Sequence, residues 1–196
     1  DKFKMNTFSL ELEETVEVLS ALHNGSLLQR EFSAIGLLGH SRGGAIGLLA
    51  ADHPAVTALA TMGAVATFDR FTQRQKAEWV EKGSISVINT RTNQALPLGI
   101  GLYHDLTENS ETSLNIQKAA GNLKKPWLIV HGEVDVTVPL REAHLLYSWS
   151  DKTKSELVEI PQSGHTFEAT HPFTVPSRGL NSALQHIVNF FDRTTG

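Results

Sequence analysis

The chain has 196 residues, of which 40% are hydrophobic and 19% are charged. These proportions are typical of one globular domain with a sizeable core, and they exclude a disordered or fibrous protein. The 17 basic and 21 acidic residues give a net charge of −4 without a basic cluster, so neither nucleic acid nor an anionic membrane is an expected partner. The sequence contains no cysteine, which excludes disulfides, thiol catalysis and Cys-ligated metal.

No apolar run approaches the roughly 18 residues that a membrane-spanning helix needs. The first residues do not form the long apolar stretch of a signal peptide. We therefore expect a soluble protein, and we take a cytoplasmic location as the default.

The first predicted elements surround a glycine-rich corner. Residues 9–23 carry apolar side chains at helical spacing and stop at an Asn-Gly pair, which predicts a helix. Residues 32–39 form a short apolar run that ends in glycine, as a buried strand does. Residues 43–53 then have the length of a helix and end before Pro54. These residues therefore predict a strand, a sharp turn and a helix in that order.

The middle of the chain is less regular. Residues 55–63 predict a buried strand, and residues 64–124 are too long for an ordinary connection. We interpret 64–124 as a cap-like insertion within a single domain that covers residues 1–196, although a crossover without a functional role remains an alternative. The insertion is predicted to contain, in order, a helix over 68–83, a hairpin over 84–98 that turns at Thr92-Asn93, and a helix over 110–122.

The last third returns to regular alternation. It predicts a strand over 124–132, a helix over 141–150, a strand over 155–161 and an amphipathic helix over 179–193. Strands that alternate with helices indicate an α/β fold with a parallel sheet.

The pentapeptide Gly-His-Ser-Arg-Gly over residues 39–43 fits the G-x-S-x-G nucleophile elbow. In this motif the serine occupies a strained turn between a strand and a helix. Glycines lie two positions away on each side because a Cβ there would collide with the neighbouring backbone. We expect Ser41 to be a nucleophile, and the backbone N–H of Arg42 to be one oxyanion donor at the helix start.

A phosphate-binding loop is the rival interpretation of this glycine-rich segment. The segment lacks the lysine of G-x-x-x-x-G-K-[ST] and does not match G-x-G-x-x-G. The same mismatch disfavours a dinucleotide-dependent oxidoreductase. No cofactor is therefore expected.

A serine nucleophile requires a histidine base and a carboxylate that orients it. Glu133 and Asp135 both follow the predicted strand over 124–132, and we select Asp135 because it lies further out in a loop that Pro139 closes. Glu133 is nearer the strand end and could point to solvent. A capping or loop-solvating role is the alternative for Asp135.

His165 is the predicted base, since it follows a strand through a Ser-Gly turn that leaves its ring free to reach Ser41. His131 ends the preceding strand too close to the acid, and His171 lies further along beside a proline. His40 adjoins the nucleophile, but we expect its side chain to leave the turn in another direction.

A metal site remains an alternative use of the polar side chains in these loops. None of them shows the H-E-x-x-H spacing of a helical zinc site, so no metal is predicted. The side chains in question are His131, Glu133, Asp135 and His165.

The segments GHSRGG, HGEVDVTVP and SGHTF, with HPF downstream, occur in an order that resembles the α/β-hydrolase superfamily. Within it, the chain resembles the dienelactone-hydrolase-like and prolyl-oligopeptidase-like serine hydrolases. The resemblance implies a three-layer sandwich with a mostly parallel sheet. It also implies that Ser41 is the nucleophile, His165 the general base and then acid, and Asp135 the residue that orients His165.

One feature departs from the superfamily pattern. Members usually place several strands and an oxyanion loop before the elbow, whereas 40 residues precede Ser41 here. We therefore expect a longer native protein, in which an N-terminal segment completes the sheet and supplies the second oxyanion donor. Losing one such donor costs on the order of a hundredfold to a thousandfold in rate.

The leading functional prediction is a serine hydrolase that cleaves a small or medium carboxylic ester through an acyl-enzyme. Its expected partner is a small acyl substrate. Peptidase, thioesterase or perhydrolase activity are the alternatives among enzymes, and a catalytically idle scaffold or binding module is the alternative from another class. Four aromatic side chains of the insertion could line an apolar pocket or simply pack: Phe68, Phe71, Trp79 and Tyr103.

Overall fold

A computed structural model describes residues 2–89 and 93–195. The chain divides into two compact units. The smaller unit contains the residues up to Glu14 together with Thr67–Asn115, and the larger one contains Thr15–Ala66 and the chain from Ile116 onward. The prediction of a single domain with a cap-like insertion over 64–124 stays a prediction.

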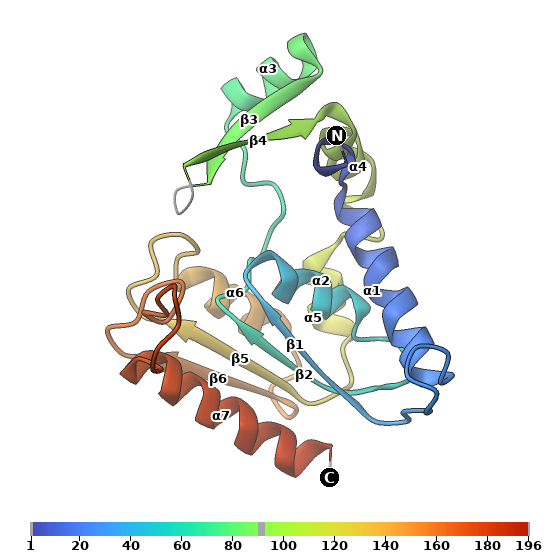
Figure 1. The fold of residues 1–196 in the computed structure, drawn as a ribbon, viewed down its shortest axis with the longest axis vertical. Coiled ribbons are helices and arrows are strands. Elements are labelled where there is room, and N and C mark those ends of the chain that lie inside the picture. The colour runs from blue at the N-terminus through green and yellow to red at the C-terminus, as the bar shows by residue number, and fades with distance from the viewer. Residues whose placement is uncertain (1, 90–92, 196) are drawn as a thin grey trace. The chain divides into compact units, whose positions relative to one another are not determined.

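The larger unit is built on a four-stranded parallel sheet (Figure 1). The strands are β1 (Ile35–His40), β2 (Val56–Met62), β5 (Trp127–Gly132) and β6 (Ser155–Ile160), and they pair in that order. The α/β fold with a parallel sheet is thereby confirmed. Within the described residues β1 is an edge strand, and its Gly39 pairs with Thr61 of β2.

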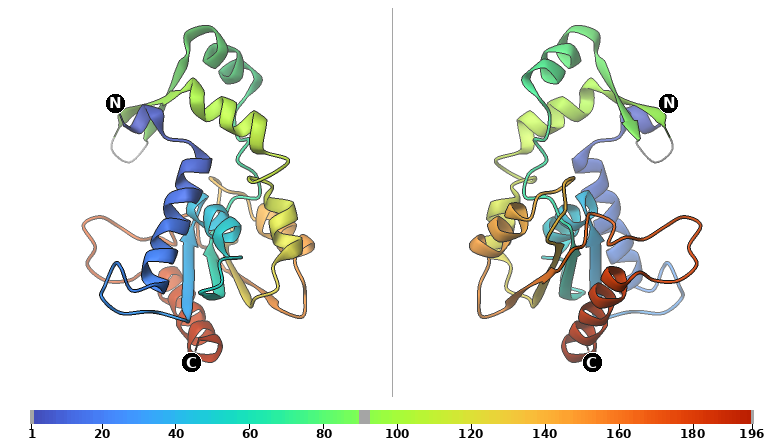
Figure 2. Two further views of the ribbon diagram at one scale, coloured as in Figure 1. Left: turned by 90° about the vertical axis from the view of Figure 1, so that its right-hand side faces the viewer. Right: turned by 90° about the vertical axis from the view of Figure 1, so that its left-hand side faces the viewer.

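Helices cover both faces of this sheet (Figures 1 and 2). They are α2 (Arg42–Ala50), α5 (Ile116–Asn122), α6 (Arg141–Trp149) and α7 (Arg178–Thr194). Successive residues of β2 alternate between the faces, as a strand requires. Ala58 and Ala60 pack in one cluster with Ile187 of α7, whereas Leu59 lies on the other face, where it meets Gly47 of α2.

Burial inside the sheet explains why the sequences of the central strands β2 and β5 are continuous apolar runs. All of β5 is buried, and so is nearly all of β2. Trp127 is fully buried, and its indole N–H donates to the Thr61 hydroxyl at 3.1 Å. A parallel sheet with helices on both faces buries both sides of its central strands. Their carboxyl ends are therefore held rigidly at one edge, where the candidate site lies.

Lys125 stabilises the end of α2 from the segment before β5. Its Nζ donates to the carbonyls of Ala51 at 2.8 Å and His53 at 2.6 Å. Burial lowers the pKa of Lys125 from its ordinary value, and the Asp52 carboxylate opposes that shift. We expect Lys125→Met to lower the free energy of unfolding by about 1–3 kcal/mol, because two helix-end carbonyls lose a charged donor. Urea denaturation measures this. The exposed Lys124→Met is the matched control, and equal small losses in both variants would contradict the prediction.

The smaller unit combines a hairpin with helices (Figure 1). Its elements are η1 (Phe3–Met5), the first part of α1 (Phe8–His23), α3 (Gln73–Lys82), β3 (Ser84–Asn89), β4 (Gln94–Gly99) and α4 (Ile100–Asn109). Trp79 is fully buried, its indole N–H donates to the Leu98 carbonyl at 2.8 Å, and the Phe71 ring packs against its edge. Trp79 therefore belongs to the core of this unit, and the half-buried Phe71 packs against it.

The helices of this region differ from their predicted positions. α3 begins after Thr72, whose hydroxyl accepts from Gln75 N–H in a capping box, so the predicted start at residue 68 was too early. The predicted helix over 110–122 is reduced to α5, and α4 was not predicted. The antiparallel hairpin is confirmed, but Thr92 of its predicted turn lies outside the described residues.

Across residues 2–89 and 93–195, no helix is both long and apolar enough to cross a membrane.

Candidate active site

Ser41 occupies the turn that joins β1 to α2. Its backbone has φ 56° and ψ −123°, a conformation that L-residues rarely adopt and that turns the chain sharply from strand to helix. The Ser41 N–H donates to the Met62 carbonyl at 2.9 Å, which fixes the turn on the neighbouring strand. The hydroxyl does not cap α2, so it is available to another partner.

The glycines around Ser41 do not have equal roles. A Cβ on Gly39 would lie 2.3 Å from the Gly43 carbonyl oxygen, which is a severe backbone collision. A Cβ on Gly43 would meet nothing within 4 Å, contrary to the expectation that both flanking glycines are sterically required. The second tight position is instead Gly44, whose Cβ would lie 2.6 Å from that of Ala64.

The structure brings Ser41, His165 and Asp135 together. His165 Nε2 lies 2.9 Å from the Ser41 hydroxyl, and His165 Nδ1 lies 2.7 Å from Asp135 Oδ2. Because a carboxylate only accepts hydrogen bonds, Nδ1 carries the proton, and Nε2 of the neutral ring then accepts from the serine. The three side chains form a continuous chain of hydrogen bonds.

The acid loop fixes the Asp135 carboxylate. Asp135 is only 5% exposed, and its Oδ1 accepts from the backbone N–H groups of Thr137 at 2.9 Å and Val138 at 2.8 Å. Gly63 lies beside the carboxylate, since a Cβ there would come within 3.3 Å of His165 Nδ1 and 3.5 Å of Asp135 Oδ2. The carboxylate is therefore aimed at His165 with little freedom to rotate.

Three competing side chains lie outside the chain of hydrogen bonds from Ser41 through His165 to Asp135. Glu133 and His171 are exposed. His131 is fully buried behind Asp135. Within the described residues, no three side chains of the types that ligate metals are grouped closely enough to hold an ion.

His40 contacts the base, which sequence reasoning did not anticipate. Its Nε2 donates to the His165 carbonyl at 2.9 Å, and the two imidazole rings pack with their centroids 4.7 Å apart. The residue before the nucleophile thus ties the elbow to the histidine loop. Only its position next to Ser41 hinted at this contact.

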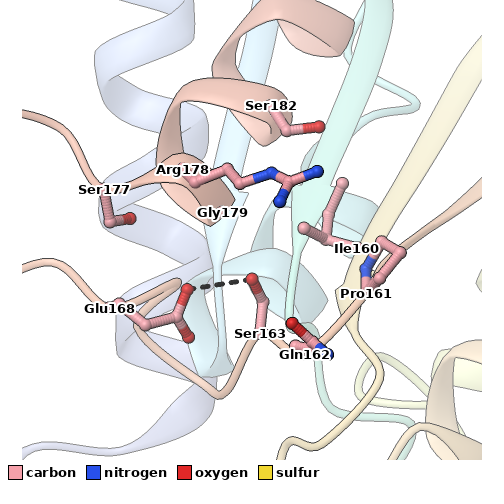
Figure 3. A pocket seen from close by; sticks show the side chains of 9 residues that line it. All are labelled: Ile160, Pro161, Gln162, Ser163, Glu168, Ser177, Arg178, Gly179 and Ser182. Carbon is pink, nitrogen blue, oxygen red and sulfur yellow. Dashed lines mark hydrogen bonds between the residues drawn. The ribbon is translucent and has the colours of Figure 1, made fainter.

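The segment before His165 is braced by Glu168. The Glu168 carboxylate accepts from the buried Ser163 hydroxyl at 2.9 Å (Figure 3). It also accepts from Gly164 N–H at 2.7 Å. Gly179 at the start of α7 packs so closely that a Cβ would lie 2.1 Å from the Ser163 hydroxyl oxygen. This brace holds the loop that presents His165.

A pocket of about 530 Å³ adjoins this brace (Figure 3). Its lining includes Ser163, Glu168 and Arg178, but none of Ser41, Asp135 and His165. The pocket is therefore separate from the candidate active site.

Arg42 is the first residue of α2, directly after Ser41. The first N–H groups of a helix have no acceptor within the helix, and the helix dipole adds a partial positive charge there. The location suits a backbone donor to an anion that develops next to the Ser41 hydroxyl. The side chain of Arg42 is exposed.

Several solved structures share this fold. The chain matches a protein of Agrobacterium vitis S4 with a TM-score of 0.74 and 17% identity, over 100% of this chain and 71% of that one. It also matches the structure of Est1E from Butyrivibrio proteoclasticus bound to ferulic acid. The TM-score is 0.72 and the identity 17%, over 98% of this chain and 71% of that one. The chain matches the monoacylglycerol lipase of Paleococcus ferrophilus with a TM-score of 0.64 and 14% identity, over 92% of this chain and 75% of that one.

A comparison with curated protein sequences found no match. The family model described as BAAT / Acyl-CoA thioester hydrolase C terminal matches residues 25–190, which is most of the chain. The narrower likeness to dienelactone hydrolases and prolyl oligopeptidases stays a prediction. The fold and the family match together place the chain in the α/β-hydrolase superfamily, as a member of the BAAT / acyl-CoA thioester hydrolase C-terminal family.

Proposed function

We propose that this chain is a serine acyl hydrolase that cleaves a carboxylic ester or a related acyl compound through Ser41, His165 and Asp135. The observation that carries the proposal is the pair of hydrogen bonds on His165, 2.9 Å to the Ser41 hydroxyl and 2.7 Å to Asp135. A serine hydroxyl is a weak nucleophile until a base is held within hydrogen-bond reach, and here the base is itself held by a carboxylate.

The geometry supports a two-step reaction. The Ser41 oxygen attacks the acyl carbonyl carbon while its proton passes to His165 Nε2, and Asp135 stabilises the imidazolium that forms. His165 then gives this proton to the departing alcohol or thiol, which leaves an acyl group on Ser41. Water loses a proton to His165, attacks the acyl-enzyme and releases the acid, and Ser41 recovers its proton. The Arg42 N–H is the proposed donor to the oxyanion of both tetrahedral intermediates.

An ester is the first candidate substrate, and an acyl thioester is the second. The ester follows from the resemblance carried by the sequence motifs. The thioester is favoured by the family, whose description names acyl-CoA thioester hydrolases. Both substrates present an acyl carbonyl to the same nucleophile, so they differ in the leaving group that the site must accommodate.

A fluorophosphonate probe followed by peptide mapping tests the proposal. We expect labelling of the native chain at Ser41 and none after heat denaturation, because only the folded site activates the hydroxyl. Initial rates on p-nitrophenyl esters and on acyl-CoA of matched chain length then separate the two substrate classes. A folded chain that is not labelled, or is labelled at another serine, would contradict the proposal and favour the idle scaffold.

A further inference from the structure

His131 is a buried histidine that the proposed reaction does not use directly. It lies in β5, just before the acid loop, and its side chain is fully buried. Its Nε2 lies 2.8 Å from the Val138 carbonyl oxygen and 3.5 Å from Asp135 Oδ2. Both neighbours accept hydrogen bonds, so Nε2 carries the ring proton.

The other ring nitrogen is unsatisfied. His131 Nδ1 is buried and has no hydrogen-bond partner among the described residues. An orphaned buried acceptor costs about 1–3 kcal/mol, a penalty that an aromatic hydrocarbon of similar shape would avoid. Filling the core therefore does not by itself explain why residue 131 is a histidine. A structural requirement for the Nε2–H donor does explain it.

The proton on Nε2 closes a loop of contacts around Asp135. His131 donates to the Val138 carbonyl, and the N–H of the same Val138 donates to Asp135 Oδ1 at 2.8 Å. Asp135 Oδ2 faces two imidazoles, His165 Nδ1 at 2.7 Å and His131 Nε2 at 3.5 Å. Oδ1 is thus held by the N–H of a peptide whose carbonyl His131 holds, and Oδ2 accepts from His165 Nδ1 with the His131 ring close beside it.

We propose that His131 is a positioning residue that sets the Asp135 carboxylate against His165. This inference rests on the proposed function. The Nε2–H tautomer suits the task, because its proton holds the Val138 carbonyl and the N–H of Val138 in turn holds Asp135 Oδ1.

Two substitutions separate a positioning role from packing. His131→Phe keeps the ring shape and removes the donor, whereas His131→Gln places an amide N–H near the position of Nε2. We expect His131→Phe to lower kcat by about tenfold to a hundredfold with little change in KM, because small displacements of a catalytic group have effects of this size. His131→Gln should recover most of the loss. His144→Gln, which alters an exposed histidine paired with Glu159, is the control with unchanged kcat.

A second readout does not depend on turnover. We expect the proton between His165 Nδ1 and Asp135 Oδ2, which are 2.7 Å apart, to give a strongly downfield proton NMR resonance. This resonance should shift or vanish in His131→Phe and persist in His131→Gln. If the Phe variant does not fold, His131→Met replaces it as the variant without a donor. An unchanged resonance and kcat in a folded donor-free variant would overturn the inference, as would equal losses in the donor-free and Gln variants.

The two readouts keep the inference distinct from the proposed function. If the native chain neither hydrolyses acyl compounds nor reacts with the fluorophosphonate, the proposed function is wrong. The NMR comparison of the His131 variants still decides, in that inactive chain, whether His131 positions Asp135.

Discussion

Ser41→Ala is expected to lower kcat for an acyl substrate by about six orders of magnitude, the loss found when the serine nucleophile of a triad is removed. The physical reason is that the Ser41 oxygen, 2.9 Å from His165 Nε2, is the proposed acceptor of the acyl group, and alanine has no hydroxyl. Alanine and serine are equally strained at φ 56°, so the substitution should leave the elbow folded. Long-incubation end-point assays on the best substrate measure the residual kcat. The midpoint of thermal unfolding, measured in parallel, checks that the variant is folded.

The double variant Ser41→Ala/His165→Ala sharpens this prediction. Residues that act as one unit are strongly non-additive, because a base has nothing to activate once the nucleophile is gone. The double variant should therefore be about as slow as Ser41→Ala alone. Losses that multiply would mean that His165 acts independently of Ser41, for example on a water molecule, and would contradict a covalent mechanism.

The fold was predictable where local pattern and tertiary environment agree. β2 and β5 are short apolar runs bounded by turns, and they are indeed buried central strands. α4 was missed because Gly99 and Gly101 suggest a loop. Its helix depends on tertiary contacts instead: Leu102 and Leu106 are buried, and Asp105 accepts from the Ser9 N–H at 2.9 Å. Such contacts outweigh local helix propensity and cannot be read from a window of sequence.

The candidate site follows the same division. The residue types and order of Ser41, Asp135 and His165 could be predicted because each follows a strand of a parallel sheet, and such strands end at one edge. The contacts of His40 with the His165 loop and of His131 with Val138 could not, because they depend on how loops curl back after the strands. The only signal in the sequence was that His40 adjoins Ser41 and that His131 lies four residues before Asp135.

Gly39→Ala is expected to lower the free energy of unfolding by about 3 kcal/mol or more, at the upper end of what overpacking costs. The new Cβ would lie 2.3 Å from the Gly43 carbonyl oxygen and 2.7 Å from the Gly44 Cα. Both obstacles are backbone, so no side-chain rotation can relieve the collision. β1 and α2 would have to separate at the turn that carries Ser41.

Gly43→Ala is the matched control, since it adds the same methyl group two residues on the other side of Ser41. Its Cβ meets nothing within 4 Å, and alanine is favoured over glycine within a helix by roughly 0.5–1 kcal/mol. Urea denaturation of the two variants should therefore give shifts of opposite sign. If both variants lose stability equally, the two glycines are needed for backbone freedom rather than for the close approach of β1 and α2. If neither loses stability, the elbow tolerates a Cβ at both positions, and steric exclusion does not explain the first glycine of the motif in this chain.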